Sequence, residues 1–226
     1  VALQIEPTAQ SQAVRASREH RAEALSVRSM LFPESVAVVG AGRRADSLGH
    51  QLLANILAAG FKGRVHAVNN EALEVLGLKS YAKVSDIPDH IDLAVVAVPA
   101  ESVLDVVQDC AAAGVKTLLV GSAGFAESGP VGEQRQQELL RTAHDSGMRV
   151  IGPNSFGLIN SHPDVSLNAS LAPVLPPIGH LGLFSQSGAL GIAVLADAAR
   201  RNLGISIFAS AGNRVDVSGN DFMQYW

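Results

Sequence analysis

The chain contains 226 residues, of which 47% are hydrophobic and 17% charged, and its formal net charge is −4. This composition allows a buried core and excludes a fully disordered chain, while the negative net charge supplies no overall field that would attract nucleic acid. The single cysteine, Cys110, excludes an intrachain disulfide framework and a zinc site built on cysteines.

The sequence shows no membrane or export signal. No apolar stretch approaches the roughly 18 residues that a membrane helix needs, and residues 1–8 lack a basic region followed by an apolar one. We therefore expect a cytoplasmic protein with no membrane or nucleic-acid partner. The chain begins at Val1 and ends at Trp226 inside a predicted helix, which indicates a fragment of a larger protein.

The first part of the chain predicts a linker, a strand and a helix. Residues 1–30 carry no strand pattern, and residues 17–30 are rich in helix formers, which predicts a linker helix. Residues 35–39 (SVAVV) form a short β-branched run that ends in glycine, as is typical of a buried parallel strand. Apolar side chains over 52–57 then recur at helical spacing, and Gly60 ends that helix.

Strands and helices alternate through the region that follows. Apolar residues over 103–111 recur at helical spacing and predict a helix with one apolar face. The other predicted elements here are a helix at 132–146 and strands at 64–68, 92–98, 116–120 and 149–151. This alternation predicts an α/β fold, a Rossmann-like doubly wound parallel sheet with right-handed crossovers.

The pattern breaks at residues 161–177, which predict a loop rich in Pro, Ser and Asn. Alternation then restarts, with strands at 179–184 and 205–209 and helices at 188–202 and from about 218. We interpret this as the first, truncated part of a second α/β domain. The predicted domains are therefore a linker helix at 1–30, a Rossmann-like domain at 31–160 and the second domain at 161–226.

The end of the first strand carries the strongest ligand-binding pattern. Ligands of open parallel sheets bind beyond the carboxyl ends of the strands, where glycines let the backbone approach a phosphate and a helix N-terminus offers N–H groups. Two arginines add donors that suit phosphate oxygens. The alternative interpretation is a tight turn with two solvated arginines and no ligand. The candidate residues of this loop are Gly40, Ala41, Gly42, Arg43, Arg44, Ser47 and Gly49.

The spacing of the glycines argues against a nicotinamide dinucleotide. The G-x-G-x-x-G fingerprint needs a glycine three residues after Gly42, but this position is Ala45 and the next glycine is Gly49. The second strand ends in Asn69 and Asn70, where NAD proteins commonly place an acidic residue for the ribose. An NAD(P)-dependent oxidoreductase therefore stays as a minor alternative.

Three further strand ends carry candidate lining residues. Pro99 stops the strand at 92–98 and presents the preceding carbonyl group to the cleft, unless it merely starts the next helix. The glycine-containing loop at 121–127 flanks a single phenylalanine, Phe125, and suits the wall of a narrow channel for an extended ligand. Asn154 fits either a ligand contact or a structural turn.

A fifth strand runs into a helix through the sequence SQSGAL. Ser187 before Gly188 predicts an N-cap, and the two serine hydroxyls and the N–H groups around the helix N-terminus predict a second anion site. Position 183 is Leu183, so the nucleophile elbow of the hydrolases is not matched. The candidate phosphate-binding residues are Ser185, Gln186, Ser187 and Gly188.

The seven histidines offer no metal site. None has a second histidine, a cysteine or a carboxylate at a metal-binding spacing on its own element. We therefore predict no metal, and we assign no catalytic residue.

Taken in order, these strand-end loops resemble the CoA-binding half of the NDP-forming acyl-CoA synthetases, relatives of the α subunit of succinyl-CoA synthetase. The matching stretches, over about residues 31–226, are SVAVVGAGRR…LG, VNN, AVVAVPAES, GSAGFAE, VIGPNSFGLIN and LFSQSGALG. The combination in this order is specific, although no single stretch is. The resemblance implies a flavodoxin-like second domain, bound CoA or acyl-CoA, and an ATP-grasp-type domain or subunit as partner.

The resemblance also assigns roles to residues. In that family the glycine loop and basic residues hold the nucleotide phosphates of CoA, the later loops line the pantetheine path, and the SQSG turn holds phosphate and faces a phosphorylated histidine. The CoA-binding residues implied here are Gly40, Ala41, Gly42, Arg43, Arg44, Ser47, Gly49, Asn69, Val98, Pro99, Ser122, Ala123, Gly124, Phe125 and Asn154. The SQSG turn corresponds to Ser185, Gln186, Ser187 and Gly188.

The chain departs from the family at both ends. The family's phosphohistidine and its orienting carboxylate lie downstream of the SQSG turn, and the sequence stops at Trp226 before either, so this fragment alone is expected to be inactive. Its N-terminal stretch resembles the connector that follows a fused N-acetyltransferase domain.

Two functions from different classes therefore remain open. The leading hypothesis is the CoA-binding module of an NDP-forming acyl-CoA synthetase. The alternative is a regulatory CoA or acyl-CoA sensor region of a protein acetyltransferase. The incomplete second sheet leaves an exposed edge, which a partner chain or a homo-oligomer would cover.

Overall fold

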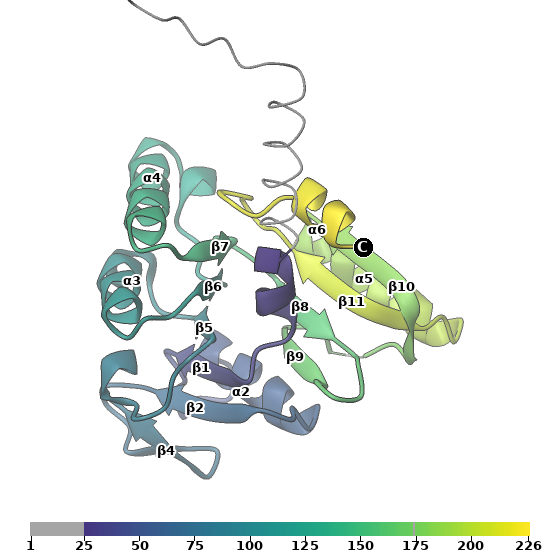
Figure 1. The fold of residues 1–226 in the computed structure, drawn as a ribbon, viewed down its shortest axis with the longest axis horizontal. Helices are drawn as coiled ribbons and strands as arrows, with labels where there is room; N and C mark the ends of the chain where they lie inside the picture. The colour runs from purple at the N-terminus through teal and green to yellow at the C-terminus, as the bar shows by residue number, and fades with distance from the viewer. Residues whose placement is uncertain (1–24, 174) are drawn as a thin grey trace, which may run out of the picture.

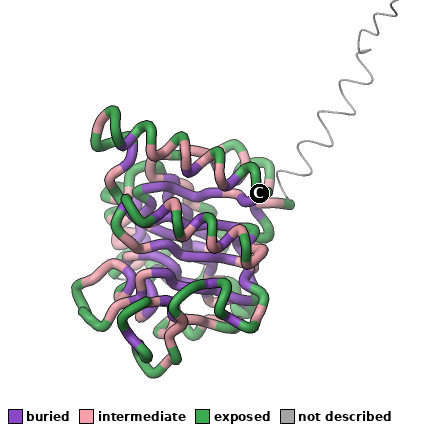
Figure 2. The backbone as a smooth tube through the Cα atoms, turned by 90° about the vertical axis from the view of Figure 1, so that its left-hand side faces the viewer, coloured by how far each residue is buried: buried purple, intermediate pink, exposed green. Residues whose placement is uncertain are grey.

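The structure is a computed structural model and describes residues 25–173 and 175–226. Two β-sheets lie side by side with helices around them (Figure 1). The backbone is buried along the strands and exposed along the outer faces of the helices (Figure 2). The Rossmann-like α/β fold predicted from the sequence is confirmed.

The first sheet has seven strands in the order β3-β4-β2-β1-β5-β6-β7. All its pairings are parallel except that between β3 and β4. The strands are β1 (Ser35–Val39), β2 (Arg64–Val68), β3 (Glu74–Val75), β4 (Leu78–Tyr81), β5 (Leu93–Val96), β6 (Thr117–Val120) and β7 (Arg149–Ile151). Because β2 and β5 flank β1 on opposite sides, the strand order reverses at β1, which is where such sheets bind ligands.

Helices cover both faces of this sheet. The helices α3 (Val103–Ala112) and α4 (Pro130–Asp145) bury apolar residues such as Val107 and Leu139 against one face. On the other face lies α2 (Leu48–Ala58), which buries Leu53 and Ile56. The second sheet packs against this same face, so α2 lies between the two sheets.

The second sheet has four strands in the order β10-β11-β8-β9. Only β10 and β11 are parallel to each other; the other two pairings are antiparallel. The strands are β8 (Gly157–Asn160), β9 (Leu167–Ser170), β10 (Ile178–Ser185) and β11 (Ile205–Ser210). The helices α5 (Gly188–Arg200) and α6 (Gly219–Tyr225) follow β10 and β11.

The structure corrects one part of the sequence interpretation. The loop predicted at 161–177 contains the strand β9, and β8 just before it was also not predicted. The sequence of β9 is LNAS, in which the polar Asn168 and Ser170 are buried and bond to each other, with 2.6 Å between Ser170 Oγ and Asn168 Oδ1. The predicted domain boundary at residue 161 falls between these two paired strands.

The described part of the linker helix packs onto the body of the protein. Residues 25–31 are helical, with Val27 and Met30 buried, and the Asn160 side chain donates to the Leu31 carbonyl oxygen at 2.7 Å. The remainder of the predicted helix, residues 17–24, lies outside the described residues. Over the ranges that the structure describes, no helix has the length and apolar character needed to cross a membrane.

Candidate ligand clefts at the strand ends

A first cleft of about 320 Å³ opens where the first sheet reverses its strand order. It brings together the glycine loop after β1 and the turn after β2, as the sequence predicts for a phosphate-binding site. Its lining residues are Gly40, Gly42, Arg43, Arg44, Ser47, Asn69, Glu71 and Ala72. The predicted residues Ala41 and Gly49 are buried behind this surface.

Two glycines allow the backbone to pack tightly under this cleft. Gly40 has φ +89°, and a Cβ atom there would lie 2.4 Å from the Ala97 carbonyl oxygen. A Cβ atom on Gly49 would lie 2.1 Å from the Gly40 carbonyl oxygen. Gly49 therefore permits a close contact between the helix and the strand. The third glycine of the dinucleotide fingerprint has the same role, but it follows the second glycine more closely in the sequence.

The two arginines of the loop are not equivalent. Arg44 donates from Nε and Nη2 to the two carboxylate oxygens of Asp46 at 3.1 and 2.8 Å. These hydrogen bonds and the charge attraction raise the pKa of Arg44 and lower that of Asp46. No ion pair joins Arg43 to any residue in the described ranges. Arg43 is therefore the arginine with its charge available for a ligand.

Polar side chains fix the backbone around the same cleft. The Asn69 side-chain oxygen accepts hydrogen bonds from the N–H groups of Glu71 and Ala72 at 2.8 and 2.9 Å, which holds the turn after β2. Ser47, at the N-terminus of α2, donates from Oγ to the Arg44 carbonyl oxygen at 2.7 Å and makes no side-chain cap bond. The glycine loop is thus braced internally.

The predicted channel wall differs from expectation. Ser122 donates from Oγ to the Val98 carbonyl oxygen at 2.6 Å, so the carbonyl group expected to face the ligand is bonded within the protein. Pro99 begins the short 3₁₀ helix at 100–102. Phe125 is fully buried in the core beneath α4, so its ring cannot line a channel.

The loop around Phe125 still reaches the surface. Ala123 is exposed and Gly124 is half-buried. Gly124 has φ +103°, and its carbonyl oxygen accepts a hydrogen bond from Arg135 at 2.5 Å. The backbone of this loop is therefore accessible from outside, whereas the phenylalanine ring is not.

A second cleft of about 490 Å³ lies between the carboxyl ends of the two sheets. It joins the ends of β6 and β7 to the turn before α5 and to the segment after β11. Its lining residues are Gly121, Asn154, Ser155, Phe156, Leu171, Gln186, Ser187, Gly188, Ala189, Ile192, Gly212 and Asn213. Asn154, predicted as a CoA contact, therefore lies beside the predicted phosphate-binding turn.

The turn before α5 has the structure expected of an anion site. The Ser187 side chain caps the helix by accepting from the Leu190 N–H at 3.3 Å, as the sequence predicts. Helix geometry leaves the N–H groups of Gly188 and Ala189 without partners inside the helix. Ser185 is buried and donates to the Ser187 carbonyl oxygen at 2.8 Å, so it shapes the turn instead of lining the cleft.

Gly212 and Asn213 belong to a segment that sequence analysis did not single out. Residues 211–217, here called the clasp, run from β11 to the edge of the first sheet. The N–H groups of Asn213 and Val217 donate to the carbonyl oxygens of Pro153 and Val150 at 2.8 and 3.2 Å. The clasp thus covers the edge strand β7 and fixes one rim of the second cleft.

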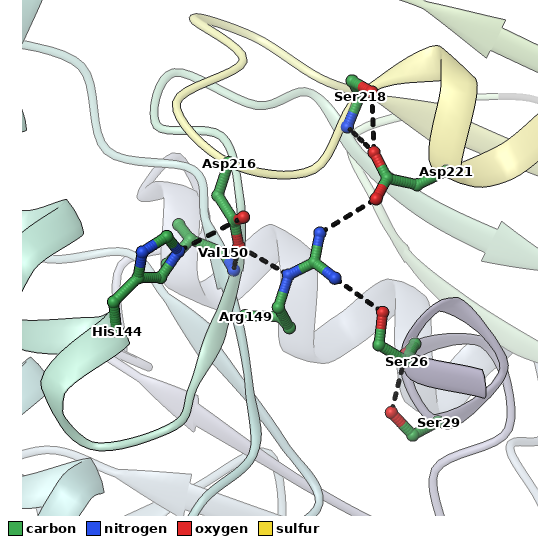
Figure 3. Close-up of polar contacts among 8 residues, drawn as sticks. All are labelled: Ser26, Ser29, His144, Arg149, Val150, Asp216, Ser218 and Asp221. Carbon is green, nitrogen blue, oxygen red and sulfur yellow. Dashed lines mark hydrogen bonds and ion pairs between the residues drawn. The ribbon is translucent and has the colours of Figure 1, made fainter. Parts of the chain in front are cut away.

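A charged network holds the clasp in place (Figure 3). Arg149 on β7 donates to Asp216 at 2.9 Å, to Asp221 at 3.0 Å and to the Ser26 hydroxyl at 2.6 Å. His144 lies 3.3 Å from the other Asp216 oxygen. Burial disfavours the charged guanidinium, but the hydrogen bonds and charges of the two aspartates outweigh it and raise the pKa of Arg149.

A second contact links the clasp to the loop around Phe125. The Asn213 side chain donates to Glu127 and to Gln136 Oε1, the latter at 2.9 Å. Glu127 also accepts from the N–H groups of Gly124 and Phe125 at 2.6 and 3.1 Å. Burial alone would raise the pKa of Glu127, but these hydrogen bonds outweigh it and lower the pKa.

The fold and the two clefts define a Rossmann-like α/β protein with one cleft at the strand ends of its parallel sheet and another between its two sheets. Comparison with known families identifies it further: the CoA binding domain family matches residues 34–161, and the succinyl-CoA ligase like flavodoxin domain matches residues 178–226. Because the first match spans more than half of the sequence, the chain belongs to the CoA-binding domain family. The resemblance predicted from the strand-end loops is confirmed.

Individual relatives point to the same enzymes. The chain is 38% identical over 208 residues to the α subunit of acetate–CoA ligase [ADP-forming] I from Pyrococcus furiosus, covering 89% of this chain and 44% of that protein. It is also 38% identical over 211 residues to a trans-feruloyl-CoA synthase from an unknown prokaryotic organism, covering 92% and 30%. The chain thus spans less than half the length of these relatives.

A solved structure supports the fold. The dinucleotide forming acetyl-coenzyme A synthetase 1 of Ca. Korarchaeum cryptofilum, in complex with phosphate and ADP, superposes with a TM-score of 0.82 and 44% identity, covering 88% of this chain and 42% of that one. All three are named as CoA ligases, synthetases or synthases, and the Pyrococcus furiosus relative is named ADP-forming. They give no support to the nicotinamide-dependent or the acetyltransferase alternative.

Proposed function

We propose that this chain is the CoA-binding and phosphate-binding part of an NDP-forming acyl-CoA synthetase. The observation that carries this proposal is the pair of clefts at the strand ends, one built on a glycine loop and the other on a capped helix N-terminus. The whole enzyme would join a carboxylic acid to CoA with hydrolysis of a nucleoside triphosphate. The named acids of the relatives range from acetate to trans-ferulate.

The first cleft suits the nucleotide end of CoA or acyl-CoA. The loop from Gly40 to Ser47 offers close backbone approach, and Arg43 offers a charge for phosphate oxygens. From there, the backbone of Val98 and Pro99 and of the loop at 122–125 would guide the pantetheine arm toward the second cleft. In this proposal Phe125 supports that loop from the core instead of touching the ligand.

The second cleft suits the phosphate of an acyl phosphate. In the thioester-forming step, the CoA thiolate attacks the acyl carbonyl carbon, a C–S bond forms, and the C–O bond to the phosphate breaks. The leaving inorganic phosphate would be stabilised by the N–H groups of Gly188 and Ala189, with donors from Asn154 and Gln186. None of the described residues that line this cleft is a histidine, so the phosphoryl acceptor is not assigned to this chain.

An ATP-grasp-type domain or subunit would complete the enzyme, in the cytoplasm. The edge strand β10, with Ile178 and Leu181 exposed, offers a surface that such a partner or a second copy would cover. Light scattering of the purified chain tests self-association: a monomer at all concentrations would argue against the second copy.

A thermal-shift titration tests the proposed function. CoA, dephospho-CoA, acetyl-CoA and NAD are compared on the same chain, because a ligand of the native state raises stability by about 2.7 kcal/mol at a hundredfold excess over its dissociation constant. The proposal expects shifts with CoA and acetyl-CoA but not with NAD. Arg43→Ala should reduce the CoA shift more than Arg44→Ala does. A shift with NAD alone would overturn the proposal.

A further inference from the structure

The second cleft has a polar rim and an apolar wall. Asn154, Gln186, Ser187 and Asn213 contribute the polar groups of the rim. The apolar wall is formed by three side chains from three different elements, each of them half-buried: Phe156, Leu171 and Ile192. Phosphate alone does not explain this apolar wall, because apolar side chains provide neither hydrogen-bond donors nor positive charge for a phosphate group.

Contacts within the protein place the central residue of the apolar wall. Phe156 donates its N–H to Ser210 Oγ at 3.1 Å and accepts at its carbonyl oxygen from the Leu171 N–H at 3.1 Å. Its ring meets the buried Phe208 ring edge-on, with 6.4 Å between centroids and an interplanar angle of 72°. These contacts place the Phe156 ring in the absence of a ligand, which lowers the cost of ordering it on binding.

The apolar wall adjoins the anion-binding end directly. A Cβ atom placed on Gly188 would lie 3.0 Å from Phe156 Cβ, so the helix N-terminus and the wall are in van der Waals contact. Ile192 follows Gly188 by four residues and shares its face of α5. An acyl chain that extends from a phosphate held at Gly188 would therefore pass Phe156 first, and Ile192 lines the same cleft one helical turn further on.

We propose that Phe156, Leu171 and Ile192 form the acyl subsite of this protein and select an apolar acyl group of several carbons over acetyl. This inference rests on the proposed function, because it requires that the phosphate of an acyl phosphate sits at the N-terminus of α5. The bound phosphoryl group would fix the position of the acyl phosphate, and the apolar wall would bury its carbon chain.

Alkylphosphonates test this subsite, because their phosphorus–carbon bond is not hydrolysed. Isothermal titration compares inorganic phosphate, n-propylphosphonate, which has the chain length of acetyl phosphate, and n-hexylphosphonate on the intact chain, with CoA titrated separately. Each methylene group that becomes fully buried tightens binding about fourfold. Because the wall is half-exposed, we expect n-hexylphosphonate to bind at least about tenfold more tightly than n-propylphosphonate.

Variants on α5 locate the effect. Ile192→Ser should reduce the hexyl-over-propyl preference at least about threefold, and Ile192→Phe should fill the cleft and weaken the binding of n-hexylphosphonate while phosphate binding persists. The matched control is Leu190→Ser on the same helix, which is 60% exposed and lies outside the cleft, and it should leave the preference unchanged.

The outcomes separate the subsite from the proposed function. Equal affinity for the two phosphonates, or a preference that Ile192→Ser and Ile192→Phe leave intact, overturns the acyl subsite while the phosphate site stands. Binding of CoA without binding of phosphate or either phosphonate overturns the phosphate site and the subsite together. Failure of CoA to bind overturns the proposed function.

Discussion

Both clefts lie at the carboxyl ends of strands, but they differ in which parts of the chain line them. The first comes from the loop after β1 and the turn after β2 in one sheet, and most of its lining lies between Gly40 and Ser47. The second draws on five separate segments, from Gly121 to Asn213, and on both sheets. The first cleft therefore depends on local backbone geometry, whereas the second depends on how the two sheets are held together.

Gly49→Ala should have the largest effect and should act on the first cleft. The new Cβ atom would lie 2.1 Å from the Gly40 carbonyl oxygen, so the backbone of the glycine loop or of α2 must shift. We expect a loss of at least about 3 kcal/mol in the free energy of unfolding, and loss of CoA binding. Urea denaturation and titration with CoA measure the two effects.

Gly42→Ala is the matched control for that substitution. A Cβ atom at this position meets Ser47 Oγ at 3.5 Å, an ordinary contact, so the fold should remain stable while the methyl group obstructs a phosphate. If Gly49→Ala proved as stable as Gly42→Ala, the tight packing under the first cleft would be refuted.

Arg149→Met should come next in size and should act on the second cleft. It would leave Asp216 and Asp221, which are only 9% and 12% exposed, without their cation. We expect a loss of about 3 kcal/mol in stability, and an affinity for phosphate at least about fivefold weaker because the clasp is released. The affinity for CoA should change little.

The control for Arg149→Met is Arg200→Met, which breaks an ion pair with Asp197 on the exposed side of α5. These side chains are 78% and 40% exposed, so stability should change by less than about 0.5 kcal/mol. Phosphate affinity that is untouched in Arg149→Met would show that the clasp does not shape the second cleft.

The serines before α2 and α5 allow a direct comparison of the two clefts at a smaller scale. Ser187 caps α5 through its side chain, whereas Ser47 makes no such bond to α2. Ser187→Ala should therefore cost about 1 kcal/mol of stability and Ser47→Ala only a few tenths. Thermal unfolding of both variants measures the difference, and equal losses would contradict the structure.

The smallest expected effect is a pH dependence of the stability, caused by His66 on β2, the strand that leads to the first cleft. Burial lowers the pKa of His66, and it outweighs the attraction of Asp89, whose carboxylate lies 3.3 Å from Nε2. Because the folded pKa is lower, the unfolded chain takes up a proton on His66 at a higher pH than the folded chain does. The stability contributed by neutral His66 is therefore present above the unfolded pKa of about 6.5 and is lost as the pH falls through the lower folded value.

His66→Gln should remove that dependence. We expect the wild-type chain to lose stability through this group as the pH falls from about 7 to about 5, and the variant to lose correspondingly less. Denaturant titrations at several pH values measure it. A wild-type chain that gained stability on acidification, relative to His66→Gln, would reverse the assigned direction.

The sequence predicts well what local patterns determine. The β-branched run of β1, the glycine loop after it and the cap at Ser187 all follow from short stretches with strong conformational preferences, and the structure has them where expected. The short strand β9 was missed because two of its buried residues, Asn168 and Ser170, are polar. They form a hydrogen bond with each other, which an apolar sequence pattern cannot predict.

Long-range contacts explain the other differences. Asn213 reaches the second cleft only because the clasp crosses from one sheet to the other, and nothing near it in the sequence shows this. Phe125 looked like a channel residue because it sits in a glycine-containing loop, but the packing of α4 buries it. Gly49 was predicted as a CoA-binding residue, and in the structure it is buried and permits the close packing of α2 on Gly40.

The central claim is that CoA and phosphate occupy two distinct clefts. Isothermal titration of the intact chain with inorganic phosphate, carried out with and without saturating CoA, tests it most directly. The account predicts that phosphate still binds to the CoA-saturated protein, and that Arg149→Met weakens this binding while leaving that of CoA intact. Loss of all phosphate binding on saturation with CoA, or binding of NAD in place of CoA, would contradict it.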